Sequence, residues 1–277
     1  MIKVGRMMKI ILSRKGFDSR FGSQPSPILP DGTLLSLPIP SKNDDLKFTD
    51  LHYQDKSYYE LIKELKPDCK IKENYTCHLD PDIKRNVIKR EPSWRGLFGQ
   101  TGRAQGHLHN ENIGLNDIFL FFGWFKETKQ TDVGLRYVKN APNLHIIYGY
   151  FQVKNIYKSY QDLPVYSKYH SHADRFLTDK NNCIYSANTS LSFNNRVSGF
   201  GCLTYNKSLV LTKQGEPKSH WDLPDFFREA RISYHSKSSF KQDYFQSAKI
   251  GQEFVVEEDN NVINWAQNII IRNKRQG

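Results

Sequence analysis

The sequence predicts an α+β fold in which a mixed, strongly twisted sheet, or a partly closed β-barrel, carries peripheral helices. Two long aromatic runs, residues 118–125 and 144–153, have the length and composition of buried strands. A third apolar run, residues 10–12, ends abruptly in a polar and basic loop. Few segments show helical spacing, and the chain has neither an internal repeat nor a clear linker.

The strongest helical signal lies at residues 57–65. Tyr58, Leu61 and Leu65 recur at the three-to-four-residue spacing of a helix face, and the pattern stops before a proline. Ser57, with Glu60 three residues later, matches a capping box. We therefore expect a short amphipathic helix here.

The other elements are weaker. Residues 74–79 read as a short strand, and residues 94–109 read as a loop followed by a short helix. Towards the C-terminus we expect strands at 183–187, 201–205, 208–212 and 251–257, a helix start at 221–227 and a helical segment at 262–271.

We expect a leader at residues 1–8 followed by one domain at residues 9–277. Within it, residues 9–110 are rich in loops and residues 111–277 are rich in strands. The absence of an internal repeat and of a clear linker between the two parts favours a single unit.

The charge balance favours a polyanionic partner. The chain of 277 residues has 40 Lys and Arg against 29 Asp and Glu, a net charge of +11 and a pI of about 9.3. Nucleic acid, DNA in the first place, is the expected partner. A mean hydropathy of −0.65 and the lack of an apolar run of about 20 residues argue against a membrane protein.

Four cysteines, Cys69, Cys77, Cys183 and Cys202, form no CxxC pair. This spacing disfavours both a zinc ribbon and a disulfide framework. Together with the lack of a secretory signal, it predicts reduced thiols and a cytoplasmic protein.

The basic loop after the first strand is a candidate phosphate or nucleotide site. Ser13, Arg14, Lys15 and Ser19 offer hydroxyls and fixed positive charges, and Asp18 adds a carboxylate. The alternative is an ordinary turn with solvated basic side chains.

His78 and Asp80 form a second candidate. On a strand they face the same side, so they could act as a general base with its orienting carboxylate, or as two metal ligands. The alternative is structural, with Asp80 as the N-cap of a helix that starts at Pro81.

Histidines also occur in two His-x-His pairs, His107 with His109 and His170 with His172. Neither pair lies in a clear strand, and no cysteine or carboxylate completes a zinc pattern. We expect hydrogen-bonding histidines and no metal, and keep His107, His170 and His172 as the alternative ligands.

Aromatic side chains are unusually frequent, with 17 Phe, 15 Tyr and 4 Trp. Alternation along residues 118–125 sends Phe122 and Trp124 to one side of the predicted strand. In a basic protein such rings suit stacking on a nucleobase. The alternative is packing in the core.

Several long motifs, in this order, resemble the nucleotide modification associated domain 3 family of bacteria and phages. They are SRKGFDSRFGSQPSPILPDGTLLSLPIP from Ser13, CHLDPD from Cys77, WRGLFGQTGRAQGHL from Trp94, DIFLFFGWF from Asp117, LHIIYGYFQV from Leu144, HSH from His170 and HWDLPDFF from His220.

The resemblance implies a role in DNA base modification, which would also suit antiviral defence. We expect an enzyme that transfers a glycosyl, ADP-ribosyl or other group, or that excises a base. Its cofactor is not identified; a nucleotide or nucleotide-sugar donor or a metal would fit. The expected roles are proton transfer by His78, Asp80 and Asp18, phosphate or nucleotide binding by Ser13, Arg14, Lys15, Ser19, Arg95, Gln100 and Gln105, and base stacking by Trp94, Phe122 and Trp124.

A fainter likeness concerns the second half of the chain. The rhythm of residues 116–122 and 148–153 is similar to that of PUA-like and EVE-like barrels, which bind RNA or modified bases. This keeps a second function open, a non-catalytic reader of a modified base in DNA or RNA.

Overall fold

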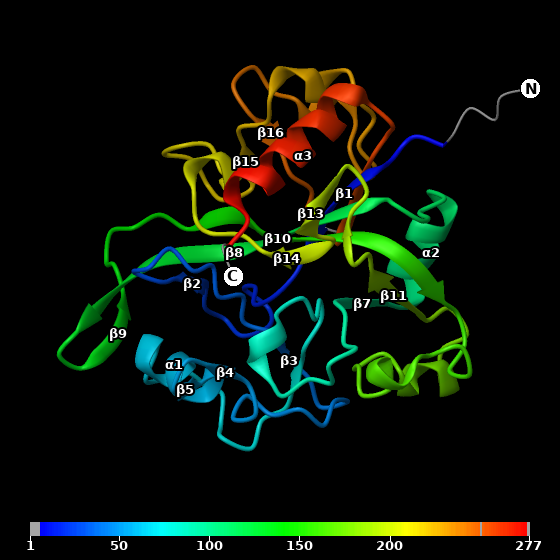
Figure 1. Ribbon diagram of the computed structural model, residues 1–277. Coiled ribbons are helices and arrows are strands. Elements are labelled where there is room, and N and C mark those ends of the chain that lie inside the picture. The colour runs from blue at the N-terminus through cyan, green and yellow to red at the C-terminus, as the bar shows by residue number, and fades with distance from the viewer. Residues whose placement is uncertain (1–5, 250, 276–277) are drawn as a thin grey trace, which may run out of the picture.

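A nine-stranded mixed sheet forms the centre of the computed structural model, which describes residues 6–249 and 251–275 (Figure 1). Its main path runs β17-β1-β8-β10-β11-β7, and β2, β9 and β14 pair with β8 or β10 off this path. β1 and β2 run parallel to β8, whereas the other pairings are antiparallel. The strands are β1 (Ile10–Arg14), β2 (Ser26–Ile28), β7 (Leu97–Gln100), β8 (Ile118–Thr131), β9 (Gly134–Tyr137), β10 (Leu144–Tyr157), β11 (Cys183–Ala187), β14 (Phe200–Cys202) and β17 (Glu253–Val256).

The two aromatic runs are the middle of this sheet. β8 and β10 pair in antiparallel register from Phe125 opposite Leu144 to Ile118 opposite Gln152, with one irregularity. Their side chains are buried on both faces, which explains why the runs are continuously apolar rather than alternating. The predicted fold class is therefore confirmed.

The sheet curls so that its two edge strands approach each other. The Phe98 ring on β7 lies 4.8 Å from the ring of Phe119 on β8, measured between centroids. Gln100, at the end of β7, donates a hydrogen bond of 2.7 Å from Nε2 to Glu253 Oε1 on β17. In the described chain β7 and β17 form no backbone ladder, so the sheet is not a closed barrel.

Three α-helices lie outside this sheet in the described residues. α1 (Tyr58–Leu65) has the predicted capping box between Ser57 and Glu60 and belongs to a separate apolar cluster. α2 (Gly102–Asn110) follows β7 directly, and α3 (Asn260–Asn273), red in Figure 1, packs beside β1. None of the helices described is long and apolar enough to cross a membrane.

Short elements fill the connections. Two-stranded ribbons pair β3 (Ile39–Pro40) with β6 (Cys77–His78), β4 (His52–Tyr53) with β5 (Lys56–Ser57), β12 (Ser190–Leu191) with β13 (Asn194–Ser198), and β15 (His220–Trp221) with β16 (Phe245–Gln246). Single 3-10 turns occupy Arg85–Val87, Val165–Ser167, Asp174–Leu177, Lys207–Leu209, Asp225–Arg228 and Lys237–Ser239.

Some local expectations are corrected. No helix starts at Pro81, because the next helical turn begins only at Arg85, so Asp80 is not a helix cap. The strand expected at 208–212 begins as a 3-10 turn, and the helix start expected at 221–227 is a 3-10 turn after Pro224.

The expected leader, residues 1–8, lies only partly in the described chain, since residues 1–5 are outside it. Arg6 pairs with Asp117 at 2.5 Å, which ties the start of the described chain to the turn before β8. All four cysteines are free thiols in the described chain, and Cys69, Cys77 and Cys183 are buried.

Candidate functional site

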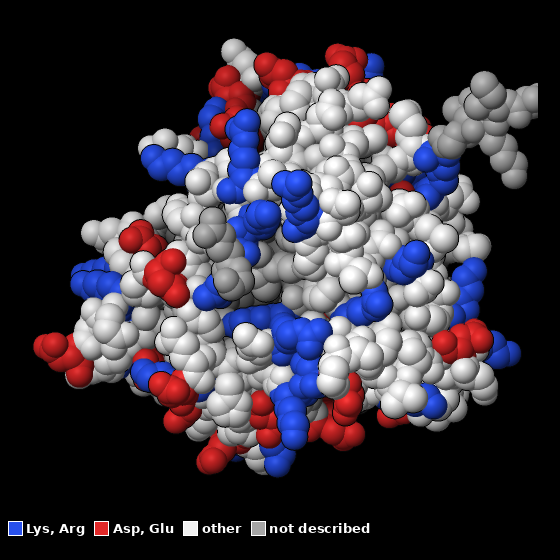
Figure 2. Space-filling model, in the orientation of Figure 1, with Lys and Arg blue, Asp and Glu red and all other residues white. Residues whose placement is uncertain are grey.

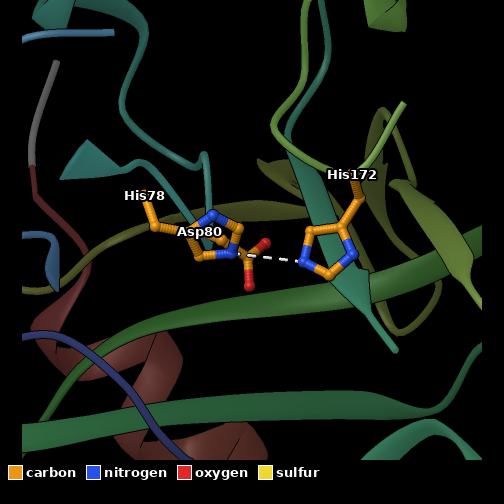
Figure 3. A group of neighbouring side chains, drawn as sticks. All are labelled: His78, Asp80 and His172. Atoms are coloured by element: carbon orange, nitrogen blue, oxygen red, sulfur yellow. Dashed lines mark hydrogen bonds between the residues drawn. The ribbon is translucent and has the colours of Figure 1, made fainter. Parts of the chain in front are cut away.

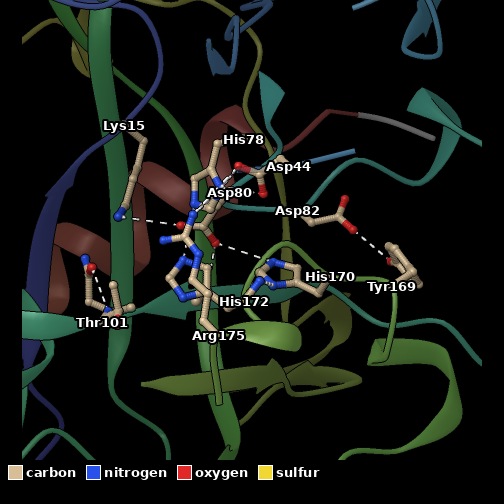
Figure 4. Close-up of polar contacts among 12 residues, drawn as sticks. Lys15, Asp44, His78, Asp80, Asp82, Thr101, Tyr169, His170, His172 and Arg175 are labelled. Atoms are coloured by element: carbon tan, nitrogen blue, oxygen red, sulfur yellow. Dashed lines mark hydrogen bonds and ion pairs between the residues drawn. The ribbon is translucent and has the colours of Figure 1, made fainter. Parts of the chain in front are cut away.

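Charged and imidazole side chains from distant parts of the chain meet where the sheet edges approach each other (Figure 4). Lys15 follows β1, His78 ends β6, and Asp80 lies just beyond it. A loop between β10 and β11 supplies His170 and His172. The curl of the sheet therefore brings together groups that are up to 157 positions apart, as for Lys15 and His172.

The centre of this cluster consists of His78, Asp80 and His172 (Figure 3). The Nε2 atoms of the two histidines lie 3.2 Å apart. One carboxylate oxygen of Asp80 completes a group whose three atoms all lie within 4.8 Å of one another. We call these three residues the histidine–aspartate centre.

Each histidine of the centre is oriented through its other ring nitrogen. His78 Nδ1 lies 3.1 Å from Asp44 Oδ2, and His172 Nδ1 lies 2.8 Å from Asn182 Oδ1. The orientation of the Asn182 side-chain amide is fixed, because its Nδ2 donates to the His172 carbonyl at 2.8 Å and a flipped amide would lose this hydrogen bond. A carboxylate and an amide oxygen only accept hydrogen bonds, so both Nδ1 atoms act as donors.

Asp80 is a buried carboxylate with several favourable neighbours. Its Oδ1 accepts a 2.7 Å hydrogen bond from the Gly99 amide and lies 3.5 Å from His170 Nε2, at the outer limit of a hydrogen bond. Lys15 Nζ is 3.7 Å from Oδ2. Burial alone would raise the pKa of Asp80, but His170 and the Lys15 charge outweigh it and hold the pKa well below its ordinary value.

Burial and neighbouring charges also shift the pKa values of His172 and Asp44. Burial lowers the pKa of His172 to about 3, against the opposite effect of Asp80, so the ring is neutral at physiological pH. Burial would raise the pKa of Asp44, but its hydrogen bond with His78 and the His78 charge lower it to about 2. The site thus holds fixed carboxylates beside a neutral imidazole.

A second buried ion pair supports the centre from the sheet side. Lys15 Nζ lies 3.1 Å from Glu253 Oε1 as well as near Asp80, and sits 4.5 Å from the centroid of the Phe98 ring. Gln100 donates to the same Glu253 oxygen. This places Lys15 between two carboxylates whose side chains are only 3% and 1% exposed.

An acidic cavity of about 940 Å³ lies beside the centre. His170 lines it together with Asp44 and Arg175, both of which contact His78. The His78 side chain keeps 12% exposure, so the centre is not sealed. The charged residues around this cavity are Asp44, Asp45, Asp50, Asp82, Lys168, Asp174, Arg175 and Asp179.

The basic loop does not form a single site. Arg14 donates to the carbonyls of Ala248 and Lys249, and burial lowers its pKa. The Asp18 carboxylate accepts from two backbone amides of its own turn, whereas the Ser13 side chain is buried and Ser19 is exposed. Of these residues, Lys15 reaches the centre.

The other expected contacts are dispersed. Arg95 donates to Thr189 at the surface, and Gln105 accepts a 2.9 Å hydrogen bond from the buried hydroxyl of Tyr185. Gln100 is connected to the centre only through Glu253 and then Lys15. Arg95, Gln100 and Gln105 therefore do not line one common binding surface.

The aromatic residues differ in what they can contact. Trp94 and Phe122 are 2% and 0% exposed, so neither has a ring face open to a base. Trp124 is half-buried; its Nε1 donates to Asn143 at 2.8 Å, and Lys218 Nζ lies 4.1 Å from its ring centroid.

Among the alternative metal ligands, His170 and His172 reach the cluster, but His107 is bonded to Ser233 at 2.9 Å elsewhere. Sequence reasoning missed Asp44, Asn182, Arg175 and Glu253. Each is a single polar residue without a motif around it, so spacing alone carried no signal for them.

A family model for nucleotide modification associated domain 3 matches residues 9–257 of the chain. The protein belongs to this family. The matched span contains every residue of the histidine–aspartate centre and its supporting ion pairs, from Lys15 to Glu253. No curated protein and no solved structure matches the chain.

Proposed function

We propose that this protein is an enzyme that modifies nucleotides within DNA, and that its reaction takes place beside the histidine–aspartate centre. This proposal depends mainly on one observation: Lys15, Asp44, Asp80 and Glu253 lie close to the imidazoles of His78 and His172 in a largely buried site. Burying so many ionisable groups costs folding free energy, and such clusters occur preferentially at functional sites. The family's association with nucleotide modification supports the same conclusion.

A second cavity, which we call the basic hollow, is lined by cationic side chains and suits the phosphates of a nucleic acid. Figure 2 shows blue side chains around a depression in the middle of the face that it draws. The hollow has a volume of about 1070 Å³, and no Asp or Glu of the described chain lines it. Its cationic residues are Lys84, Arg85, Arg196, Lys274 and Arg275.

Lys84 is the most distinctive of these cations. Its Nζ has no hydrogen-bond partner among the described residues and lies 4.4 Å from the centroid of the Tyr53 ring. Burial lowers the pKa of Lys84 to about 8. The other charged or titratable groups near it are Tyr53, Tyr58, Cys202, Asp31 and Arg275. The Nζ atom itself is buried, so a phosphate in the hollow would supply its missing partner once the Lys84 side chain turns outward.

One short segment, residues 79–85, separates the hollow from the centre. Asp80 and Asp82 lie on the side of the centre, whereas Lys84 and Arg85 line the hollow. Phosphates are attracted to the hollow and repelled by the acidic cavity. An uncharged base turned out of the helix would meet no such repulsion there.

The centre fits transfer or excision chemistry at a glycosidic bond. The Asp80 carboxylate stays ionised and can stabilise positive charge that develops on a sugar. The His172 imidazole, which is neutral at physiological pH, can accept a proton at Nε2 from an attacking hydroxyl or amine. Glycosyl transfer, ADP-ribosyl transfer and base excision all share these requirements.

The test is mass spectrometry of nucleosides from cells that express the protein, beside the variant Asp80→Asn. Asp225→Asn is the matched control, because that side chain is fully exposed (100%) and lines neither the acidic cavity nor the basic hollow. We expect a new or missing nucleoside with the wild type and the control only, with circular dichroism showing all three proteins folded. Unchanged DNA together with tight, salt-dependent binding of modified DNA would reject the enzyme and favour a reader.

A further inference from the structure

We infer that His78, Asp80 and His172 bind one divalent transition-metal ion through two imidazole Nε2 atoms and a carboxylate oxygen. As a cofactor this ion would serve the proposed function and rests on it: it would supply the Lewis acid for the transfer in place of the proton-accepting role of the imidazoles, whose Nε2 atoms it would occupy. Binding itself can be measured without any reaction. Two histidines with one carboxylate are a known ligand set for zinc and for non-haem iron.

The spacing of the nitrogens fits a shared ion. With metal–nitrogen bonds of about 2.05 Å, two ligands 3.2 Å apart subtend an angle of about 103° at the metal. That angle lies close to the tetrahedral value of roughly 109°. The nitrogens therefore need little movement to coordinate the ion.

The hydrogen bonds around the rings leave the right atoms free. Because His78 Nδ1 and His172 Nδ1 donate to Asp44 and Asn182, the two rings direct their Nε2 atoms towards each other at 3.2 Å, and either a proton or a metal ion must lie between these atoms. Two lone pairs beside the Asp80 carboxylate repel one another unless a positive charge lies between them. A histidine that binds a metal through one ring nitrogen usually donates the N–H of its other ring nitrogen to an oxygen acceptor, as His78 and His172 do here.

The backbone near the centre leaves room for this arrangement. Gly99 donates its amide to Asp80 Oδ1, and a Cβ added at Gly99 would lie 2.3 Å from the His172 ring. At position 99, therefore, only glycine allows the β7 backbone to donate to the Asp80 carboxylate while the His172 imidazole packs against it. Three protein ligands leave at least one coordination position for water or substrate.

A shared proton is the competing arrangement. Arg175 NH2 lies 3.4 Å from His78 Nδ1, and if it donated there, His78 Nε2 would carry a proton towards His172. This arrangement needs no ligand from Asp80 and predicts no specific metal affinity.

The test uses the purified full chain, stripped with EDTA and titrated with Zn²⁺ against a chromophoric chelator, and separately with Co²⁺ while its visible absorption is recorded. We expect one ion per chain, confirmed by elemental analysis after reloading. His172→Gln should weaken Zn²⁺ binding about 100-fold or more. His107→Gln, which changes a histidine outside the cluster, should bind like the wild type.

Gly99→Ala provides a second variant that keeps all three ligands. We expect it to lose Zn²⁺ affinity because the added methyl group displaces the His172 ring. If the folded wild type binds Zn²⁺ no more tightly than His172→Gln, the metal site is rejected, and the arrangement in which His78 and His172 share a proton is supported instead. Tight Zn²⁺ binding with unmodified DNA would instead reject the proposed function and leave the metal site intact.

Discussion

Replacing Lys15 with methionine should destabilise the protein strongly. The substitution keeps an unbranched apolar side chain over the Phe98 ring but removes the cation between Asp80 and Glu253. Both carboxylates are nearly inaccessible to solvent, at 3% and 1% exposure, so water cannot replace the lost partner. Removing one partner of a buried ion pair typically costs about 3–5 kcal/mol, a large share of a total stability of about 5–15 kcal/mol.

Urea unfolding followed by circular dichroism measures this cost. With a slope of about 3 kcal/mol per molar urea, the midpoint should fall by about 1–1.7 M. Lys129→Met, at an exposed position of β8, should change stability by less than about 0.5 kcal/mol. The double variant with Glu253→Gln should recover part of the loss, because it also removes one of the two stranded charges. A loss below about 1 kcal/mol, or strictly additive effects, would refute the reasoning.

Three further predictions address the capping box and the hollow. Ser57→Ala should lower the free energy of unfolding by about 1 kcal/mol in urea titrations, since it removes the cap of α1; an unchanged midpoint would contradict this. Lys84→Met should reduce the slope of log affinity against log salt for a short DNA duplex by about 1, measured by fluorescence anisotropy; an unaltered slope would remove Lys84 from the interface. Since the pKa of Lys84 is about 8, the lysine is charged below that pH and neutral above it, so wild-type affinity should fall between pH 7 and pH 9. Lys84→Met should lack this component of the fall, and an identical pH profile would argue against it.

Local patterns predicted the elements well because they depend on neighbouring residues. The capping box before α1 and the strand over β11 appear at the expected positions. The parallel pairing of β1 with β8 joins residues more than 100 positions apart, as for Ile10 and Ile118, and no local pattern encodes it. The same holds for the curl that brings β7 near β17.

The candidate site was predictable in pieces. His78 with Asp80, and the His170–His172 pair, stand out in the sequence as separate motifs. Their convergence depends on how the loop between β10 and β11 folds back over β7, which hydrophobic periodicity does not describe. Asp44 was not foreseen for a similar reason, since a carboxylate in a polar segment usually faces solvent.

The meeting of the two sheet edges has a consequence for how the centre can form. Lys15 follows the first strand, Gln100 ends β7 and Glu253 begins β17, the last strand; Lys15 pairs with both Asp80 and Glu253, and Gln100 donates to Glu253. Contacts of such high sequence separation form only after the chain has closed long loops. A fragment that ends before β17 would leave Lys15 with one carboxylate and Gln100 without its acceptor. We therefore expect the ion pairs around Lys15 to form late in folding, once β17 has paired with β1.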